Sequence, residues 1–250
     1  MRIAHIITRM VLGGAQENTL LTAAAQQAAG HEVLLITGPT EGAEGELVSR
    51  AEELGVRMHL VPDMVREPDP ARDVRALKTL IHLLREGRYT LVHTHMSKSG
   101  VLGRIAARLA GVPVIIHTPH GHVFHSYYSP AKTRLFWLLE RTCALFTDRI
   151  IALTENEKRE HVELRIAPEE RFAVIHSGVD FDRYAGPPGP GAVSRADFGI
   201  PPEAPVIGCV ARLVPIKGHT YLLAAMAQVL RQFPEARLLL VGDGPCAAEL

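Results

Sequence analysis

Residues 206–218 read Val-Ile-Gly-Cys-Val-Ala-Arg-Leu-Val-Pro-Ile-Lys-Gly, a short β-branched run followed by two cations, Arg212 and Lys217. The apolar run predicts a strand over Val206–Val210, and the periodic residues after the loop predict a helix over Thr220–Phe233. Two cations ahead of a helix N-terminus suit a dianionic ligand, because free N–H groups and the helix dipole favour negative charge and arginine offers a bidentate fork. An ordinary βα turn with solvated charges is the alternative interpretation.

The same alternation of short apolar runs and longer helical patterns extends over the whole chain. It predicts a parallel sheet covered by helices on both faces, an α/β doubly wound, Rossmann-like fold. Further strands are predicted at Ile3–Ile7, Val33–Thr37, Arg57–Val61, Leu91–His95, Val114–Thr118, Arg149–Leu153, Phe172–Ile175 and Arg237–Val241. Further helices are predicted at Ala15–Ala29, Glu46–Leu54, Asp73–Arg85, Gly100–Ala110, Ala131–Phe146 and Glu155–Glu163.

A stretch rich in proline and glycine divides the chain. Between residues 183 and 205 little regular structure is expected beyond one turn around Ser194–Phe198. We therefore expect an N-terminal domain over residues 1–182, a linker over 183–205 and a second Rossmann-like domain that begins at 206. Residues 206–250 supply two strands, one helix and the start of another, which cannot bury both faces of a sheet, so this second domain is expected to be incomplete.

Composition excludes several classes of protein. With 27 basic and 27 acidic residues the formal net charge is zero, so there is no electrostatic case for a nucleic-acid partner. Cys143, Cys209 and Cys246 are far apart, which predicts reduced thiols and no Cys-based zinc site. No stretch approaches the length of a membrane span and no signal-peptide pattern begins the chain. We expect a cytoplasmic protein that is at most peripheral to a membrane.

The predicted helix Ala131–Phe146 has the composition of a membrane-surface helix. Lys132, Arg134 and Arg141 accompany several leucines and aromatic residues on it, so it could rest on an anionic membrane. Packing of its apolar stripe against the sheet is the favoured interpretation.

Two glycines, Gly13 and Gly14, follow the first predicted strand and precede a helix. Paired glycines let the backbone approach a ligand closely, and the helix N-terminus favours an anion. The pattern is not the Gly-x-Gly-x-x-Gly fingerprint, and no acidic residue clearly ends the second strand, so binding of a nicotinamide dinucleotide is disfavoured. A tight turn without a ligand is the alternative.

The connection after the fifth predicted strand, residues 118–128, reads Thr-Pro-His-Gly-His-Val-Phe-His-Ser-Tyr-Tyr. It is long for a βα loop and follows the carboxyl end of a strand, where open α/β sheets bind ligands. Its imidazoles and phenols suit contact with a sugar. Zinc binding is disfavoured, because no carboxylate flanks the candidate ligands and the spacing does not direct all four rings at one point. Those candidates are His117, His120, His122 and His125.

His93 and His95 share one face of the fourth predicted strand, because side chains alternate along a strand. The favoured interpretation is a partly buried, hydrogen-bonded pair near the strand end.

Together these motifs resemble the GT-B glycosyltransferases of family 4, which are two-domain, retaining enzymes that use nucleotide-sugar donors. Enzymes of capsular, exopolysaccharide or lipopolysaccharide assembly are the most similar in pattern. The resemblance covers nearly the whole chain. It rests on Gly13-Gly14, Leu91-Val92-His93-Thr94-His95, Thr118-Pro119-His120-Gly121, Ile175-His176-Ser177-Gly178-Val179-Asp180, Ala211-Arg212-Leu213-Val214-Pro215-Ile216-Lys217-Gly218 and Leu240-Val241-Gly242-Asp243-Gly244-Pro245.

The resemblance implies a role for each matching position. Arg212 and Lys217 would bind the donor diphosphate and offset the charge that develops on it during transfer. His120 would contact the donor sugar near the reacting centre, and it is not assigned as a general base. Gly13, Gly14, Gly242 and Gly244 would lie at the donor site, and Gln16, His95 and His122 on the acceptor side.

The resemblance also implies that the nucleotide-diphosphate sugar is a co-substrate and that neither a metal nor another cofactor is needed. The acceptor would be a glycan or a lipid-linked molecule, and the protein would contact the inner face of the membrane peripherally.

The sequence departs from the family pattern in two ways. Ser177 stands where the family usually has asparagine in a turn, and the family's paired glutamates would lie beyond Leu250. We therefore expect little or no activity from these 250 residues alone. Two alternatives stay open, a non-catalytic glycan- or partner-binding subunit and a GT-B-like sugar-nucleotide epimerase.

Overall fold

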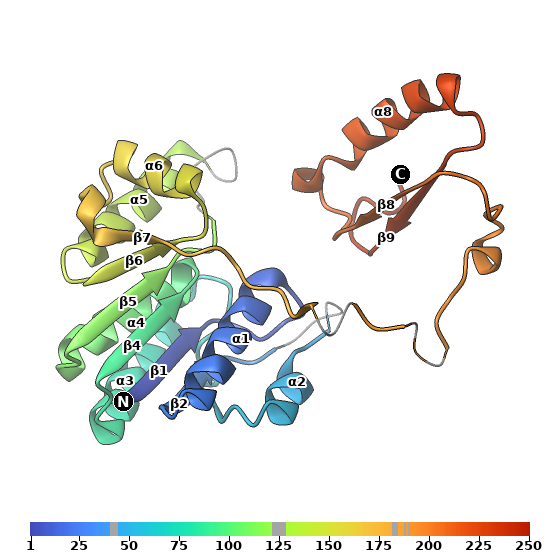
Figure 1. The fold of residues 1–250 in the computed structure, drawn as a ribbon. Coiled ribbons are helices and arrows are strands. Elements are labelled where there is room, and N and C mark those ends of the chain that lie inside the picture. The colour runs from blue at the N-terminus through green and yellow to red at the C-terminus, as the bar shows by residue number, and fades with distance from the viewer. Residues whose placement is uncertain (41–44, 122–128, 182–184, 188, 190) are drawn as a thin grey trace. The chain divides into compact units, whose positions relative to one another are not determined.

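The computed structural model describes residues 1–40, 45–121, 129–181, 185–187, 189 and 191–250. These residues form two compact units, Met1–Asp180 and Phe181–Leu250, which we call the first and second units. Each has its own sheet (Figure 1).

The first unit contains a fully parallel sheet with strand order β3-β2-β1-β4-β5-β6-β7. Its strands are β1 (Arg2–Ile7), β2 (Glu32–Thr37), β3 (Met58–Leu60), β4 (Leu91–His95), β5 (Val114–Thr118), β6 (Arg149–Ala152) and β7 (Phe172–Val174). The order reverses direction between β1 and β4. This is the doubly wound arrangement predicted from the alternating pattern, and all seven strands lie where the sequence places them, within a residue or two at each end.

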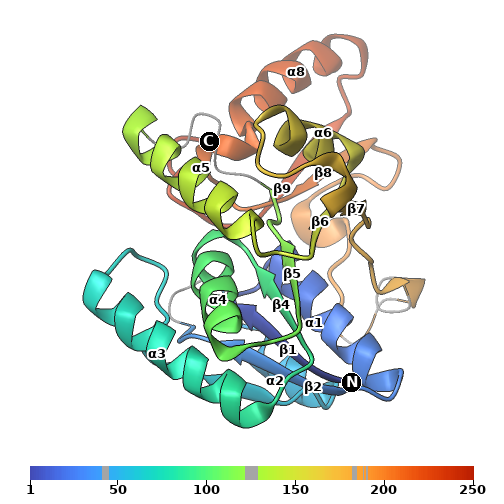
Figure 2. The same ribbon diagram turned by 90° about the vertical axis from the view of Figure 1, so that its left-hand side faces the viewer.

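Helices cover both faces of this sheet. They are α1 (Gly14–Ala28), α2 (Val48–Glu53), α3 (Pro70–Gly87), α4 (Ser97–Ala110), α5 (Pro130–Ala144) and α6 (Glu155–Glu163), with a 3₁₀ turn η1 (Glu169–Arg171) before β7. Figure 2 shows α3 and α4 in front of one face, while α1 and α2 lie on the other (Figure 1).

Alternation along β1 divides the core between the two faces. Ile3 and Ile7 pack with residues of α1, α2 and β2, whereas Ala4 and Ile6 pack with residues of α3 and α4. Side chains on a strand alternate, so His5, between Ile3 and Ile7 in this pattern, faces the α1 side. It is fully buried.

Two helices begin three residues earlier than the sequence pattern suggested. Helix α3 begins at Pro70, because Asp69 caps it by accepting hydrogen bonds from the backbone N–H groups of Ala71 and Arg72. Helix α4 begins at Ser97, immediately after β4, because Met96 adopts a positive φ of 64° that turns the chain sharply.

A buried ion pair joins α4 to α5. The Arg104 guanidinium donates to both carboxylate oxygens of Glu140 at 2.8 and 2.7 Å, and its Nε donates to the Gly100 carbonyl. Burial opposes ionisation of Glu140, but the Arg104 charge outweighs it, so the pKa of this carboxyl is about 2. His117 of β5 approaches the same carboxylate at 3.5 Å.

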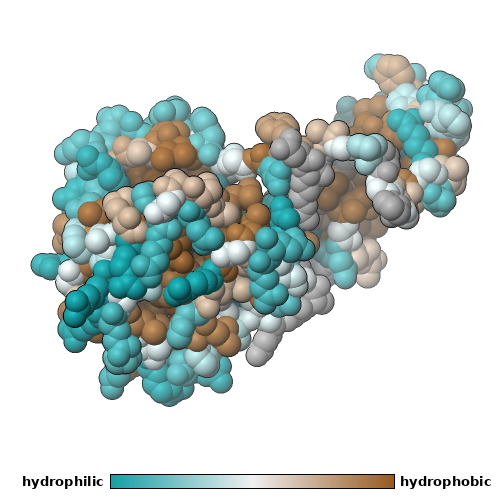
Figure 3. Space-filling view, turned by 60° about the horizontal axis from the view of Figure 1, so that its bottom comes forward, coloured by the Kyte–Doolittle hydropathy of each residue, from teal (hydrophilic) through white to brown (hydrophobic). Residues whose placement is uncertain are grey.

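The second unit contains the parallel pair β8 (Val206–Val210) and β9 (Arg237–Val241), connected through α8 (His219–Gln232). Two 3₁₀ turns, η2 (Ala196–Phe198) and η3 (Pro215–Lys217), precede β8 and α8. Figure 3 shows hydrophobic residues at the surface of both units. In the second unit the exposed apolar side chains include Val210, Tyr221 and Phe233, because a two-stranded sheet with one helix covers few of its own side chains.

Among the described residues, none of the helices combines the length and the apolar character that a membrane crossing requires. Helix α5 packs through Trp137, Cys143 and Ala144, so its apolar residues are partly used in the core. Leu135 and Leu138, each 53% exposed, lie outside that packing. The thiols of all three cysteines are free.

Candidate functional site

The carboxyl edge of the first unit's sheet brings several predicted residues together. Gly13 caps α1 in an extended conformation and Gly14 is its first residue. A Cβ on Gly13 would lie 2.9 Å from Gln16 Oε1, so the glycine leaves room for the buried Gln16 side chain. The Gln16 amide contacts Met96 Sδ at 3.8 Å, which links the turn after β1 to the turn after β4.

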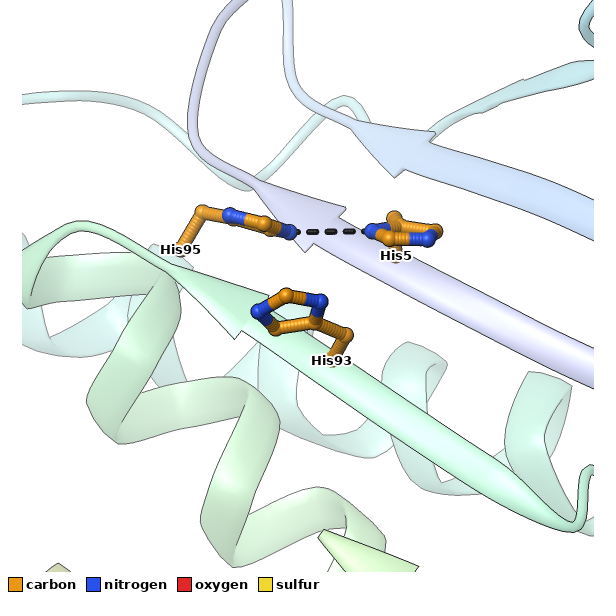
Figure 4. Close-up of side chains that lie close together, drawn as sticks. All are labelled: His5, His93 and His95. Carbon is orange, nitrogen blue, oxygen red and sulfur yellow. Dashed lines mark hydrogen bonds between the residues drawn. The ribbon is translucent and has the colours of Figure 1, made fainter. Parts of the chain in front are cut away.

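Four histidines gather where β1, β4 and the end of β5 meet. His5 Nδ1 lies 3.0 Å from His95 Nε2 (Figure 4), and His95 Nδ1 lies 3.0 Å from His120 Nε2. The His93 ring stands beside this line, 4.1 Å from the His95 ring, and its Nε2 is 2.8 Å from Thr118 Oγ1. The cluster lies where the strand order reverses, which is where open parallel sheets bind ligands.

This cluster extends the pair expected from the sequence. His93 and His95 are 5% and 1% exposed, so they are buried more deeply than expected, and His5 completes a set of three. The sequence pattern alone did not single out His5. The strand register pairs His5 with His93 directly, so a register for β1 and β4 would have revealed it.

All four rings are neutral at physiological pH. Burial lowers the pKa of His5 and of His120 to about 4. Burial, followed by the repulsion of neighbouring imidazoles, places the pKa of His93 and of His95 well below the ordinary value. A neutral imidazole carries one N–H and one acceptor nitrogen, so each ring can donate once and accept once.

The geometry would admit a metal at a set of histidines other than the zinc candidates of the loop after β5. One nitrogen from each of His5, His93 and His95 lies within 4.8 Å of the others. Within the described part of the chain this group includes no carboxylate or thiolate, so a divalent cation would bring buried charge without a counter-charge. His122 and His125 lie outside the described residues. The expectation of a site without metal stays a prediction.

His120 and Gly121 form a strained turn held by a buried carboxylate. Both have positive φ, 57° and 89°. Glu157 of α6 accepts hydrogen bonds from Gly121 N at 2.9 Å and from Leu153 N at 2.6 Å. The turn and the start of α6 line an open pocket of about 320 Å³ that includes His120, Gly121, Leu153, Thr154, Asn156, Glu157 and Glu160. Glu157 therefore positions His120 at the pocket.

The sequence pattern did not single out Glu157 either, although Thr154-Glu155-Asn156-Glu157 fits a capping box. Thr154 does cap α6, since its hydroxyl accepts from Glu157 N. The glutamate carboxylate, however, bonds to the turns after β5 and β6, so the local motif serves a tertiary contact.

We expect Glu157→Leu to cost about 3 kcal/mol in the free energy of unfolding, because two backbone N–H groups lose a charged acceptor. Urea unfolding measures this. Glu155→Leu, an exposed change in the same turn, should cost less than about 1 kcal/mol. Equal losses in the two variants would show that Glu157 does not hold the turn.

The second unit places both predicted cations on one loop. Arg212 and Lys217 are exposed, Lys217 ends η3, and α8 begins two residues later at His219. The predicted order of strand, cationic loop and helix N-terminus is therefore confirmed.

Gly242 and Gly244 shape this loop from the adjacent connection. A Cβ on Gly242 would lie 1.9 Å from the Ala211 carbonyl oxygen, and one on Gly244 would lie 2.3 Å from that of Leu213. Both glycines have φ near +150°, at 152° and 155°. Leu213 N also donates to the Asp243 carbonyl at 2.8 Å. The glycines therefore set the path of the Arg212 loop, and direct contact with a ligand stays a prediction.

Comparison with known proteins identifies the family. A family model described as a glycosyl transferase 4-like domain matches residues 13–178, and one described as glycosyl transferases group 1 matches residues 192–250. The chain belongs to the glycosyltransferase 4 family. The family resemblance seen in the sequence is thus confirmed.

Two relatives illustrate the range of this glycosyltransferase family. A UDP-Gal:alpha-D-GlcNAc-diphosphoundecaprenol alpha-1,3-galactosyltransferase of Escherichia coli is 31% identical over 252 residues, which covers 100% of this chain and 64% of the relative. A D-inositol 3-phosphate glycosyltransferase of Rhodococcus jostii is 31% identical over 258 residues, which covers 95% of this chain and 55% of the relative. The chain thus spans less than two thirds of these glycosyltransferases.

Solved structures support the GT-B fold. Anabaena HepE, in complex with UDP and glucose, superposes with a TM-score of 0.75 at 21% identity, covering 100% of this chain and 63% of that one. Sucrose-phosphate synthase from Thermosynechococcus elongatus gives a TM-score of 0.72 at 21% identity, covering 97% of this chain and 62% of that one. The GT-B fold class predicted for this chain is therefore confirmed.

Proposed function

We propose that the protein transfers a sugar from a nucleoside-diphosphate sugar to a glycan or lipid-linked acceptor, with retention of configuration and without a metal ion. The observation that carries this proposal is the pair of exposed cations, Arg212 and Lys217, on the loop that leads into α8. Two cations and a helix N-terminus supply the electrostatic stabilisation that a departing diphosphate needs.

The named relatives support the same substrate classes. The Escherichia coli galactosyltransferase uses UDP-Gal and a diphosphoundecaprenol-linked acceptor, and the Anabaena structure contains UDP and glucose. In this protein we assign the sugar contact to His120, which lines the pocket beside α6. Gln16 is assigned to the acceptor side. Both ring nitrogens of His95 are bonded to other histidines, so His95 acts behind His120.

Calorimetric titration with UDP, GDP and ADP sugars tests the donor assignment. Arg212→Ala and Lys217→Ala are each expected to weaken binding at least about tenfold, because each removes a charge-assisted contact to the diphosphate. Arg231→Ala, an exposed cation in the last turn of α8, is the matched control and should bind as the parent does. A double variant with unchanged affinity would exclude the diphosphate role and favour a non-catalytic subunit.

An epimerase function has weaker support. A UDP-N-acetylglucosamine 2-epimerase superposes with a TM-score of 0.60 at 13% identity, which reflects the shared fold alone. The family models match glycosyltransferases, so we keep that assignment.

We place the protein in the cytoplasm, with α5 in peripheral contact with an anionic membrane face. Leu135 and Leu138 are half-exposed beside the cations of this helix. Leu135→Glu is expected to lower binding to vesicles of anionic lipid about tenfold, whereas Val74→Glu, an exposed apolar site on α3, should not. Vesicle sedimentation measures the difference, and equal binding by both variants would exclude α5 as the contact.

A further inference from the structure

A hydrogen-bonded line runs through the first unit from α1 to the pocket. Gln26 Oε1 lies 2.8 Å from His5 Nε2, His5 Nδ1 lies 3.0 Å from His95 Nε2, and His95 Nδ1 lies 3.0 Å from His120 Nε2. Gln26 is partly buried on α1, and the two central rings are buried. Each inner ring therefore uses both nitrogens within the line.

The direction of the line follows from its first member. The Gln26 amide oxygen only accepts, so His5 donates from Nε2 and keeps Nδ1 as an acceptor. His95 must then donate from Nε2 to His5 and accept at Nδ1. By the same step His120 donates from Nε2 to His95. Neutral rings have one N–H each, so the choice made at Gln26 decides every tautomer along the line.

We propose that Gln26, His5 and His95 are positioning residues that fix His120 as its Nε2–H tautomer, so that His120 Nδ1 accepts a hydrogen bond from a sugar hydroxyl. This inference deepens the proposed function and rests on it for the identity of the ligand. The hydroxyl must donate, which makes the site selective for a sugar bearing a free hydroxyl at the position that meets His120.

Burial gives the line its stability. Reversing the His5 or the His95 ring alone would place two N–H groups, or two acceptor nitrogens, against each other at the buried His5–His95 contact, at a cost comparable to an unsatisfied buried polar group. His93 is held apart from the line by its bond to Thr118 Oγ1 and packs against the His95 ring. The tautomers therefore change together or remain fixed together.

Nitrogen NMR of the ¹⁵N-labelled protein tests the line without any ligand, because protonated and bare imidazole nitrogens have widely different shifts. The parent protein should show His120 protonated at Nε2. Gln26→Glu keeps an acceptor and should preserve this state, whereas Gln26→Lys offers only donors and should move the proton of His120 to Nδ1. Gln26→Leu should populate both tautomers.

Gln27→Leu is the matched control, because Gln27 is the neighbouring residue on α1 and its side chain donates to the Gly55 carbonyl, away from the line. It should leave the His120 tautomer as it is in the parent. An unchanged tautomer in both Gln26→Leu and Gln26→Lys would overturn the proposal. So would a stoichiometric metal ion in the purified protein that His5→Leu removes, since the nitrogens of the line would then be ligands.

Donor analogues with single hydroxyls replaced by fluorine test the sugar contact, because fluorine cannot donate. One such analogue should bind the parent about threefold to tenfold more weakly than the natural sugar, as for one lost hydrogen bond. Gln26→Lys should show little of that loss. If no nucleotide sugar binds, the proposed function fails, while the NMR measurement still tests whether Gln26 sets the tautomer of His120. If sugars bind, but each analogue loses the same affinity in the parent and in Gln26→Lys, only the inference about the tautomer fails.

Discussion

Lowering the pH from about 7.5 to about 5.5 is expected to remove most of the free energy of unfolding of the first unit. Among the residues that the structure describes, four histidines with lowered pKa values are buried in its sheet and a fifth, His120, is partly buried just after β5. The pKa of His5 and of His120 is about 4, that of His117 is about 3, and those of His93 and His95 lie well below the ordinary value. Burial is the leading cause for each of them.

Stability falls at lower pH because the folded and unfolded chains bind different numbers of protons. The folded-state pKa values are depressed, so the unfolded chain binds more protons than the folded chain between about pH 6.5 and about pH 4. Stability is therefore complete above the unfolded value and is lost as the pH falls through this window. Each buried ring contributes about 1.4 kcal/mol of loss at about pH 5.5, and five such losses are comparable to the whole stability of a domain.

Urea unfolding at a series of pH values measures this effect. His93→Gln should make the dependence on pH shallower, since one fewer buried group titrates. His82→Gln, at an exposed position on α3, should leave the slope unchanged. The same unfolding midpoint at both ends of the range would mean that these histidines are not buried in the neutral form.

Replacing Arg104 by methionine is expected to destabilise the first unit by about 3 to 5 kcal/mol, because Glu140 would be left as a buried carboxylate without its partner. The bidentate contact at 2.8 and 2.7 Å and the burial of both groups are the reason for so large an effect. The pKa of Glu140 should rise in this variant, since the charge that holds it at about 2 is gone.

The double variant Arg104→Met with Glu140→Leu should recover most of the loss, because two apolar side chains can replace a buried ion pair with little cost. Lys158→Met, which breaks the contact with the exposed Glu169, is the control and should cost less than about 1 kcal/mol. Chemical unfolding of the parent and the three variants measures these differences. A double variant no more stable than Arg104→Met would show that the unpaired Glu140 carboxylate is not the cause of the loss.

Local pattern predicted the elements with few errors. Strands β4, β5, β8 and β9 and helix α6 lie at the predicted residues, because β-branched runs, helical spacing and glycine or proline punctuation are properties of neighbouring residues. The early start of α3 also had a local cause, the Asp69-Pro70 cap. The start of α4 did not, since it depends on the positive φ of Met96 in the folded chain.

The sequence by itself determined the doubly wound α/β class, the family and the cationic loop that leads into α8. Each of these features depends on residues that are contiguous in the sequence. The loops that follow parallel strands also lie at a common edge of the sheet, which places them without further information. Only the tertiary structure decided that His5 and Gln26 belong with His95 and His120, and that Glu157 holds the turn at His120. Those contacts depend on which strands are neighbours and in which register, and that is set by packing between residues far apart in the chain.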